Sequence, residues 1–413
     1  MSVPSGTAVI IGGALRADSD VVWQRVVAEA GGAGARVAVF PTAAYEPQRA
    51  AAQIVHALQR CGARPEVVPV APHLAGHDLQ VALHDPALIA RVASAQAVFF
   101  SGGAQAYIVD TLQPGGRATP LLDAIRALFA AGGVVAGTSA GAAVMSRMMF
   151  RDAMDNLAVL KGQWRAGLEY DRGLGFVDGT LLVDQHFLKR GRIGRLLPAL
   201  RSLGCRHGLG VDENAAVVVR GTRLEVIGAS GAVLVDMAAA TQDAALPAFN
   251  LRGARLSLLG SGDRHDLATG ETVPAPGRTR ETRPQPPATD ASAGPQAQRY
   301  FLDMLGDGCL RSALLQLLYG TEPEVGGLAY RAHPPAGEAA PELGFEFRLQ
   351  RGPAFSGWRA GPPGSDDCSV LDVRLDVLPV RLAVPLFTPL AAAAAHGGGI
   401  PEQGAAAHNR GHG

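Results

Sequence analysis

Short apolar runs alternate with amphipathic segments through the first part of the chain. The runs, each followed by glycine, proline or serine, lie at residues 8–11, 37–40, 97–100 and 134–136. Segments with apolar residues at helical spacing lie at residues 20–30, 48–61, 88–93 and 121–131. Strands separated by helices pair in parallel, and a sheet covered on both faces has continuously apolar strands. The pattern predicts an α/β fold with a mostly parallel sheet flanked by helices.

The pattern changes after residue 210. Closely spaced strand candidates at 215–220, 222–227 and 232–235 predict an antiparallel edge. A helix is expected over residues 299–319, and strands over 344–350 and 369–377. The predicted division is a first domain over residues 1–262, a linker rich in Pro, Thr, Arg and Gly over 263–295, a smaller α+β module of unassigned role over 296–390, and a disordered Ala/Gly/His tail over 391–413.

Charge and cysteine content exclude several classes of function. The 413 residues contain 37 Lys and Arg against 37 Asp and Glu, and zero net charge argues against a general binder of nucleic acid or anionic membranes. The four cysteines form no CxxC pair, which favours a reducing compartment. No signal-peptide pattern and no apolar run of about 18 residues is present, so a cytoplasmic protein is expected. No metal or cofactor is expected, because HExxH and Cys/His ligand spacings are missing.

The strongest chemical signal is Gly137-x-Ser139-x-Gly141, which lies between an apolar strand and an apolar helix. This is the context of a nucleophile elbow, in which a strained strand-to-helix turn exposes the nucleophile. The amide hydrogens and positive dipole at the start of the helix then face the developing oxyanion. The alternative is a packed Gly/Ala turn in which Ser139 caps the helix.

A nucleophilic serine needs a base, and His186 is the leading candidate. It stands at the end of a predicted strand, so we expect it to share one edge of one sheet with Ser139. His207 competes, and a hydrogen-bonded core histidine is the alternative for His186. The acid that orients the imidazole remains open among several carboxylates, namely Asp155, Asp184, Asp212 and Glu213.

Three arginines follow His186 within nine residues. Arg192 and Arg195 share a helix face if the segment is helical, and Arg190 lies close to them at its start. Guanidiniums grip carboxylates bidentately, so the three would form a carboxylate-binding wall. The alternative is a solvated basic helix face.

The motifs GTSAGA, DQHF-x-x-R-x-R-x-x-R-L and GVDEN, in this order, closely resemble the cyanophycinase family of serine peptidases, which also contains aspartyl dipeptidase. The resemblance covers about residues 5–260. It implies a flavodoxin-like fold similar to class I glutamine amidotransferases. It also implies a Ser139 nucleophile, a His186 base and Glu213 as the acid, in preference to Asp155. The substrate pocket that it implies contains Gln105, Asp184, Gln185, Arg190, Arg192 and Arg195.

The resemblance further implies an exopeptidase that cleaves the polyaspartate backbone of cyanophycin and releases β-aspartyl-arginine dipeptides. Homodimers are common in the family. For the oxyanion, we expect the backbone amides of Ala140 and Gly103. The sequence departs from the family at Ala104, where Asn or Asp is usual, so one pocket hydrogen bond is in doubt.

Two alternatives are kept, and two other enzyme classes are argued against. An aspartyl or isoaspartyl dipeptidase would use the same triad on short peptides, and a non-catalytic cyanophycin-binding protein would carry a decayed site. A glutamine amidotransferase would need cysteine at the elbow, which Ser139 argues against. An ordinary α/β-hydrolase would place its acid before a late histidine.

Overall fold

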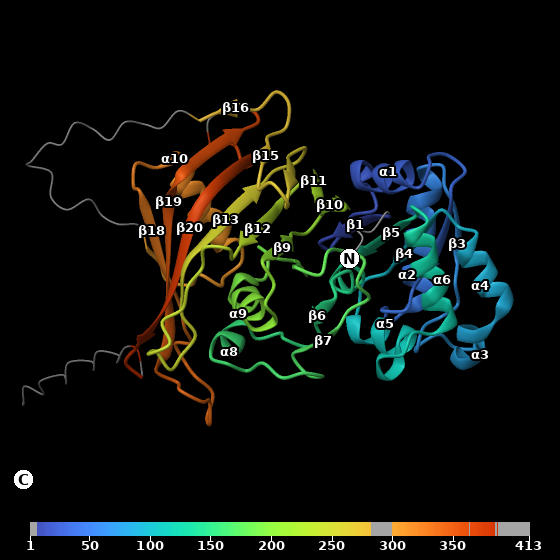
Figure 1. Ribbon diagram of the computed structural model, residues 1–413, viewed down its shortest axis with the longest axis horizontal. Coiled ribbons are helices and arrows are strands. Elements are labelled where there is room, and N and C mark those ends of the chain that lie inside the picture. The colour runs from blue at the N-terminus through green and yellow to red at the C-terminus, as the bar shows by residue number, and fades with distance from the viewer. Residues whose placement is uncertain (1–5, 282–299, 363, 385, 387–413) are drawn as a thin grey trace, which may run out of the picture.

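Two large sheets form the body of the protein (Figure 1), seen in a computed structural model that describes residues 6–281, 300–362, 364–384 and 386. The first sheet carries the helices of the N-terminal half, and the second contains the C-terminal strands. A two-stranded sheet of β6 (Met148–Phe150) and β7 (Tyr170–Arg172) is separate from both.

The first sheet is mixed. Its parallel strands, in spatial order, are β1 (Thr7–Ile11), β5 (Val134–Thr138), β4 (Ala97–Phe100), β2 (Arg36–Phe40) and β3 (Arg64–Val67). On the other side of β1 the sheet continues with antiparallel strands, namely β10 (Ala215–Arg220), β11 (Arg223–Gly228), β14 (Arg264–Asp266) and β15 (Thr272–Val273). The mostly parallel sheet and its antiparallel edge are thus confirmed. The strand order differs from the 2-1-3-4-5 order of flavodoxin-like sheets, because β1 pairs with β5 and β10.

Helices cover both faces of the parallel strands. One face packs against α1 (Asp20–Glu29) and α2 (Pro47–Arg60). The other face packs against α3 (Leu79–His84), α4 (Pro86–Ala93), α5 (Gln105–Leu112), α6 (Pro120–Ala130) and α7 (Ala140–Ala143), and a 3₁₀ turn, η1 (Pro114–Gly116), follows α5. Central β1, β4 and β5 are almost wholly buried, which explains their uninterrupted apolar sequences.

The second sheet is largely antiparallel. Its strands, in spatial order, are β17 (Tyr300–Phe301), β18 (Glu324–Ala329), β19 (Leu343–Arg359), β20 (Cys368–Arg381), β13 (Leu251–Leu259), β12 (Ala232–Asp236), β9 (His207–Val211) and β8 (Leu181–Gln185), and β16 (Thr279–Arg280) pairs with β19. Its core also takes in α8 (Asn156–Leu160), α9 (Ile193–Leu203) and α10 (Cys309–Tyr319). Since β20 pairs with β13, residues on both sides of the predicted boundary at residue 262 share one sheet and one core.

Several local expectations differ from the structure. Residues 232–235 form β12, which pairs with β9 and β13 in the second sheet and not with the hairpin of the first. The helix expected over residues 299–319 begins only at Cys309, because Gly308 has a φ of +65° and ends the loop before it. Residues 264–280 of the predicted linker contain β14, β15 and β16. The rest of that linker from residue 282, and the predicted tail 391–413, lie outside the described residues.

Candidate active site

Ser139 occupies the turn between β5 and α7 with φ +53° and ψ −108°, a backbone conformation that is costly for a residue with a side chain. The turn needs small neighbours, because a Cβ on Gly137 would lie 2.4 Å from the carbonyl oxygen of Gly141. The structure thus gives Ser139 the strained strand-to-helix geometry that the elbow pattern predicts. Its side chain makes no cap hydrogen bond to α7, which counts against the helix-cap alternative.

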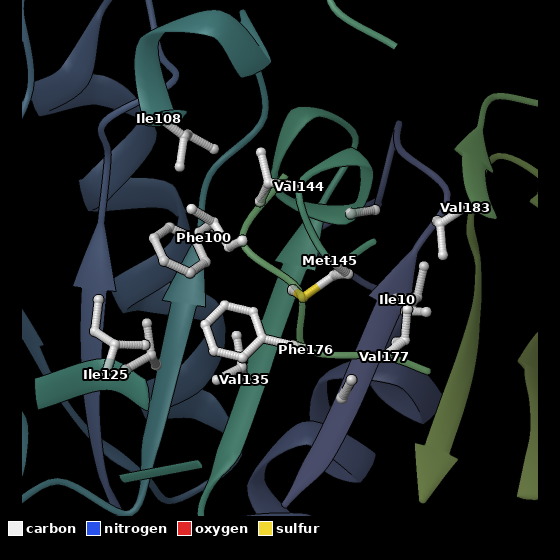
Figure 2. Close-up of a cluster of buried hydrophobic side chains, with 14 of the residues drawn as sticks. Ile10, Phe100, Ile108, Ile125, Val135, Val144, Met145, Phe176, Val177 and Val183 are labelled. Atoms are coloured by element: carbon white, nitrogen blue, oxygen red, sulfur yellow. The ribbon is translucent and has the colours of Figure 1, made fainter. Parts of the chain in front are cut away.

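A buried apolar cluster joins β5 to the neighbouring strands and to the segment after α7 (Figure 2). Phe100 at the end of β4, Ile108 of α5 and Met145 after α7 belong to one cluster with Val135 of β5. All four side chains are fully buried. Close-packed protein interiors have low compressibility, so the cluster holds the nucleophile turn in a fixed position and orientation.

His186 reaches Ser139 from the other sheet. It follows β8, whereas Ser139 follows β5, so the expectation that both lie on one edge of one sheet is wrong. The backbone of Gly12 after β1 brings the sheets together here: the His186 amide donates to the Gly12 carbonyl over 2.7 Å. A Cβ on Gly13 would lie 2.3 Å from Nε2 of His186, so the imidazole packs directly on this glycine.

Three side chains form a linear hydrogen-bonded series. Ser139 Oγ lies 2.8 Å from His186 Nε2, and His186 Nδ1 lies 2.6 Å from Glu213 Oε1. Glu213 stands just after β9, the parallel neighbour of β8. With Nδ1–H donating to Glu213, Nε2 is left as the acceptor for the serine proton. Burial lowers the pKa of His186, Arg190 and Arg192 lower it further, and Glu213 opposes the shift.

The other polar candidates lie elsewhere. Asp155 caps α8 through the Ala158 amide and pairs with Arg331. Asp212 accepts from the Lys189 amide, and burial raises the pKa of its carboxyl. His207 begins β9, at the opposite end of that strand from Glu213, with Nε2 3.9 Å from Asp236. Of the acids left open by the residues alone, Glu213 is the one in contact with the His186 imidazole.

The expected oxyanion groups border Ser139. A Cβ on Gly102 would lie 3.3 Å from the Ser139 Cβ, which puts the loop after β4 against the nucleophile. Gly103 has a φ of +137° and fits against the Ala43 carbonyl, a place with no room for a side chain. In the part of the chain that the structure describes, the amides of Gly103 and Ala140 donate no hydrogen bond to the protein. Gly103 is exposed, whereas Ala140 is fully buried beneath the nucleophile turn.

Gln105 opens α5 beside this loop. Its side-chain nitrogen donates to the carbonyl oxygens of Phe150 and Arg151, at 3.0 and 2.8 Å. The residue is half-buried and ties α5 to β6. Ala104, which caps α5, offers no side-chain oxygen to the helix amides.

Two of the three arginines expected to contact substrate are buried. Arg192 and Arg195 are 3% and 1% exposed, and both bind the fully buried Asp184, Arg195 with its Nε 2.8 Å from Oδ2. The three predicted residues thus form an internal cluster and do not form an exposed carboxylate-binding wall. Burial, with the charge of Arg195 beside it, lowers the pKa of Arg192 to about 9. Arg190 alone of the three arginines is exposed.

Gln185 is also buried, and within the described residues its Oε1 has no hydrogen-bond partner. Its carbonyl accepts from Arg192 over 2.6 Å. The cluster of Asp184, Arg192 and Arg195 therefore fixes the strand end that carries His186, and its two guanidiniums against one carboxylate leave a net positive charge beside the imidazole.

Contacts that the sequence did not predict brace the segment after His186. The Gly308 amide donates to the Leu188 carbonyl, and Lys189 pairs with Asp307. A Cβ on Gly191 would lie 1.9 Å from the Leu305 carbonyl oxygen. These groups are more than 100 residues apart in the chain, and no local sequence pattern predicts a contact between them. The loop before α10 is thus packed against the segment that presents the histidine.

Among the described residues, no group of three or more His, Cys, Asp or Glu side chains is placed to hold a metal ion. No helix within the described ranges is long and apolar enough to span a membrane.

Comparison with known families identifies the chain. Residues 9–227 match the model of peptidase family S51, and this segment contains Ser139, His186 and Glu213. The chain belongs to peptidase family S51. This S51 peptidase is 32% identical to a cyanophycinase of Geminocystis herdmanii over 274 residues, which are 64% of this chain and 95% of the relative. It is 28% identical to a cyanophycinase of Trichormus variabilis over 287 residues, 67% of this chain and 91% of the relative.

Among solved structures, the S51 chain is similar to a peptidase from an acI-B1 Actinobacterium. That likeness has 21% identity and a TM-score of 0.44, and it covers 63% of this chain and 96% of the other.

Proposed function

We propose that this S51 peptidase is a serine-type exopeptidase that hydrolyses the polyaspartate backbone of cyanophycin and releases β-Asp-Arg dipeptides. The observation that carries the proposal is the series Ser139–His186–Glu213, with contacts of 2.8 and 2.6 Å. The cyanophycinases at about 30% identity supply the substrate class. The proposed chemical steps follow from the contacts between Ser139, His186 and Glu213.

His186 Nε2 takes the proton of Ser139 as Oγ attacks the carbonyl carbon of the scissile aspartyl bond. Negative charge gathers on the carbonyl oxygen, and the amides of Ala140 and Gly103 stabilise it. His186 then gives its proton to the leaving amine, and an acyl ester remains on Ser139. A water molecule, deprotonated by the same nitrogen, hydrolyses the ester. Throughout, Glu213 holds Nδ1–H and stabilises the imidazolium.

The charge around His186 suits a substrate rich in carboxylates. Arg190, Arg192 and Arg195 against Asp184 give this side of the site an excess of positive charge. Arg190, which is exposed, is the group proposed to meet a substrate carboxylate directly, and the buried pair acts through its field and by holding the strand end. Gln105 and Gln185 are proposed to complete the pocket. The homodimer implied by the family is part of this proposal and is tested by analytical ultracentrifugation.

The test compares Ser139→Ala with the unaltered chain on insoluble cyanophycin, with release of β-Asp-Arg measured by mass spectrometry. We expect the variant to release none while its melting temperature stays unchanged. Ser94→Ala, at the exposed serine that follows the last residue of α4, should keep full activity. Labelling with a serine-reactive phosphonate should occur on Ser139 only.

The remaining alternatives give different results. A dipeptidase would cleave aspartyl or isoaspartyl dipeptides and leave the polymer intact. A binding protein with a decayed site would bind the polymer and leave Ser139 unlabelled. Undiminished release by Ser139→Ala would contradict the assignment of the nucleophile.

A further inference from the structure

Three aromatic rings meet on the surface at one edge of the first sheet. The rings of Tyr45 and His73 are stacked with centroids 6.3 Å apart, and both meet the Tyr107 ring edge-on, at 5.8 and 4.9 Å. We call these three residues the aromatic patch. Tyr45 is 68% exposed, His73 is exposed and Tyr107 is half-exposed. Rings that contribute so little to the core are available for a ligand.

The aromatic patch lies on the same edge of the sheet as the nucleophile. Tyr45 follows β2, His73 follows β3, and Tyr107 lies in α5 after β4, while Ser139 follows β5. All four strands are parallel, so their carboxyl ends share one edge. Direct contacts join the two places: the Ala104 amide donates to the Ala43 carbonyl over 2.9 Å, and Gly102 borders Ser139.

The first turn of α5 separates the aromatic patch from the proposed pocket. Gln105 extends to the carbonyls of Phe150 and Arg151 at β6, whereas the Tyr107 ring meets rings from the loops after β2 and β3. The two side chains thus contact opposite neighbours of the same helix. If one unit of the polymer binds at Gln105, the aromatic patch stays free to bind another unit of the same polymer.

The chemistry around the rings favours a flat cation. Aromatic faces attract a guanidinium electrostatically and stack on its plane. Asp110 lies three residues beyond Tyr107 on α5, and with Asp171 it shares Arg151, so this trio carries one net negative charge. Glu46 adjoins Tyr45 and pairs with Arg49. The surroundings of the aromatic patch therefore contrast with the positive cluster beside His186.

We propose that the aromatic patch is a guanidinium-binding subsite, at which Tyr45, His73 and Tyr107 hold an arginyl side chain of the polymer. This inference rests on the proposed function and deepens it. Positive charge beside His186 would meet the aspartyl carboxylates, and the aromatic patch would meet the arginines. The two subsites together would bind both kinds of charged group on a zwitterionic polymer.

Binding to the Ser139→Ala chain tests the subsite without turnover. The probe is a soluble cyanophycin fragment of several β-Asp-Arg units, titrated by calorimetry. We expect Tyr107→Leu and Tyr45→Leu each to weaken binding by about tenfold. Tyr107→Phe and Tyr45→Phe keep the ring and should bind as the parent does. Tyr300→Leu removes an exposed tyrosine of β17 and should change nothing. Unchanged melting temperatures show that the folds are intact.

A second probe isolates the charge. In a fragment whose guanidiniums are replaced by neutral urea groups, the leucine variants should bind as tightly as their parent. Unchanged binding of the charged fragment by both leucine variants would overturn the subsite, and so would equal losses with the charged and neutral fragments.

Hydrolysis of the charged fragment by the unaltered chain is scored separately. If that chain leaves the fragment intact while Ser139→Ala binds it through the rings, the proposed function fails and the subsite stands. If hydrolysis occurs and the leucine variants bind normally, only the subsite fails. If no form of the chain binds the fragment, both are wrong.

Discussion

Nδ1 of His186 lies 2.6 Å from Oε1 of Glu213, and the two residues follow the neighbouring parallel strands β8 and β9. Parallel neighbours in register bring the residues after their carboxyl ends together, so this pairing is built into the second sheet. Ser139, in contrast, comes from the first sheet. The candidate site therefore depends on how the two sheets dock as well as on each sheet alone.

The His186–Glu213 contact predicts a large effect of Glu213→Gln. The amide keeps the shape of the side chain but loses the charge that holds Nδ1–H and stabilises the imidazolium, so kcat should fall about 10⁴-fold. Asp155→Asn is the matched control, because Asp155 caps α8 and has no contact with the imidazole. Steady-state kinetics on the soluble fragment measure both. A larger loss for Asp155→Asn would reverse the assignment of the acid.

The environment of His186 predicts the acid side of the pH profile. Burial holds the pKa of this imidazole below its ordinary value of 6.5, and Arg190 acts in the same direction. Because the neutral imidazole is the base, kcat/KM should rise with pH through a pKa below 6.5. Arg190→Gln removes a nearby positive charge and should move this limb to higher pH. Arg64→Gln changes an exposed arginine on edge strand β3 and should leave the acid limb of the pH profile in place. If Arg190→Gln also leaves the acid limb in place, the electrostatic coupling is contradicted.

The buried cluster predicts a stability effect at Asp184. Asp184→Asn would leave Arg192 and Arg195 buried without their counter-charge, and removing one partner of a buried pair costs about 3–5 kcal/mol. Denaturant unfolding measures the loss. Asp18→Asn, at an exposed pair with Arg16, should leave the free energy of unfolding nearly unchanged. Equal, small effects at the two sites would mean that the cluster contributes little.

The contact between Gly191 and Leu305 predicts a coupling between the C-terminal part of the chain and the site. Gly191→Ala must relieve both a φ of +56° and a Cβ only 1.9 Å from the Leu305 carbonyl oxygen, so the segment after His186 should shift. We expect a lower melting temperature and a reduced kcat. Gly204→Ala is matched, with a φ of +66° and open space, and should cost about 1 kcal/mol with normal kcat. Equal kcat in both variants would exclude this coupling.

Much of the first sheet could be predicted because its signals are local. Buried parallel strands such as β4 and β5 read as uninterrupted apolar runs, and the glycines around Ser139 mark a turn that tolerates no larger residue. The helix expected before Cys309 shows the limit of this approach. Its apolar spacing is helical, but Gly308 and the contacts of its loop with Leu188 set a different path.

By itself, the sequence determined the strained serine turn, the strand-end histidine and the acidic candidates near it, since strand ends and small residues are properties of short segments. Only the tertiary structure decided that Ser139 and His186 come from different sheets, that Glu213 is the acid in contact, and that Arg192 and Arg195 are buried on Asp184. The aromatic patch likewise joins residues of two loops and one helix. Such choices depend on which surfaces pack together, and packing is set by contacts between residues far apart in the chain.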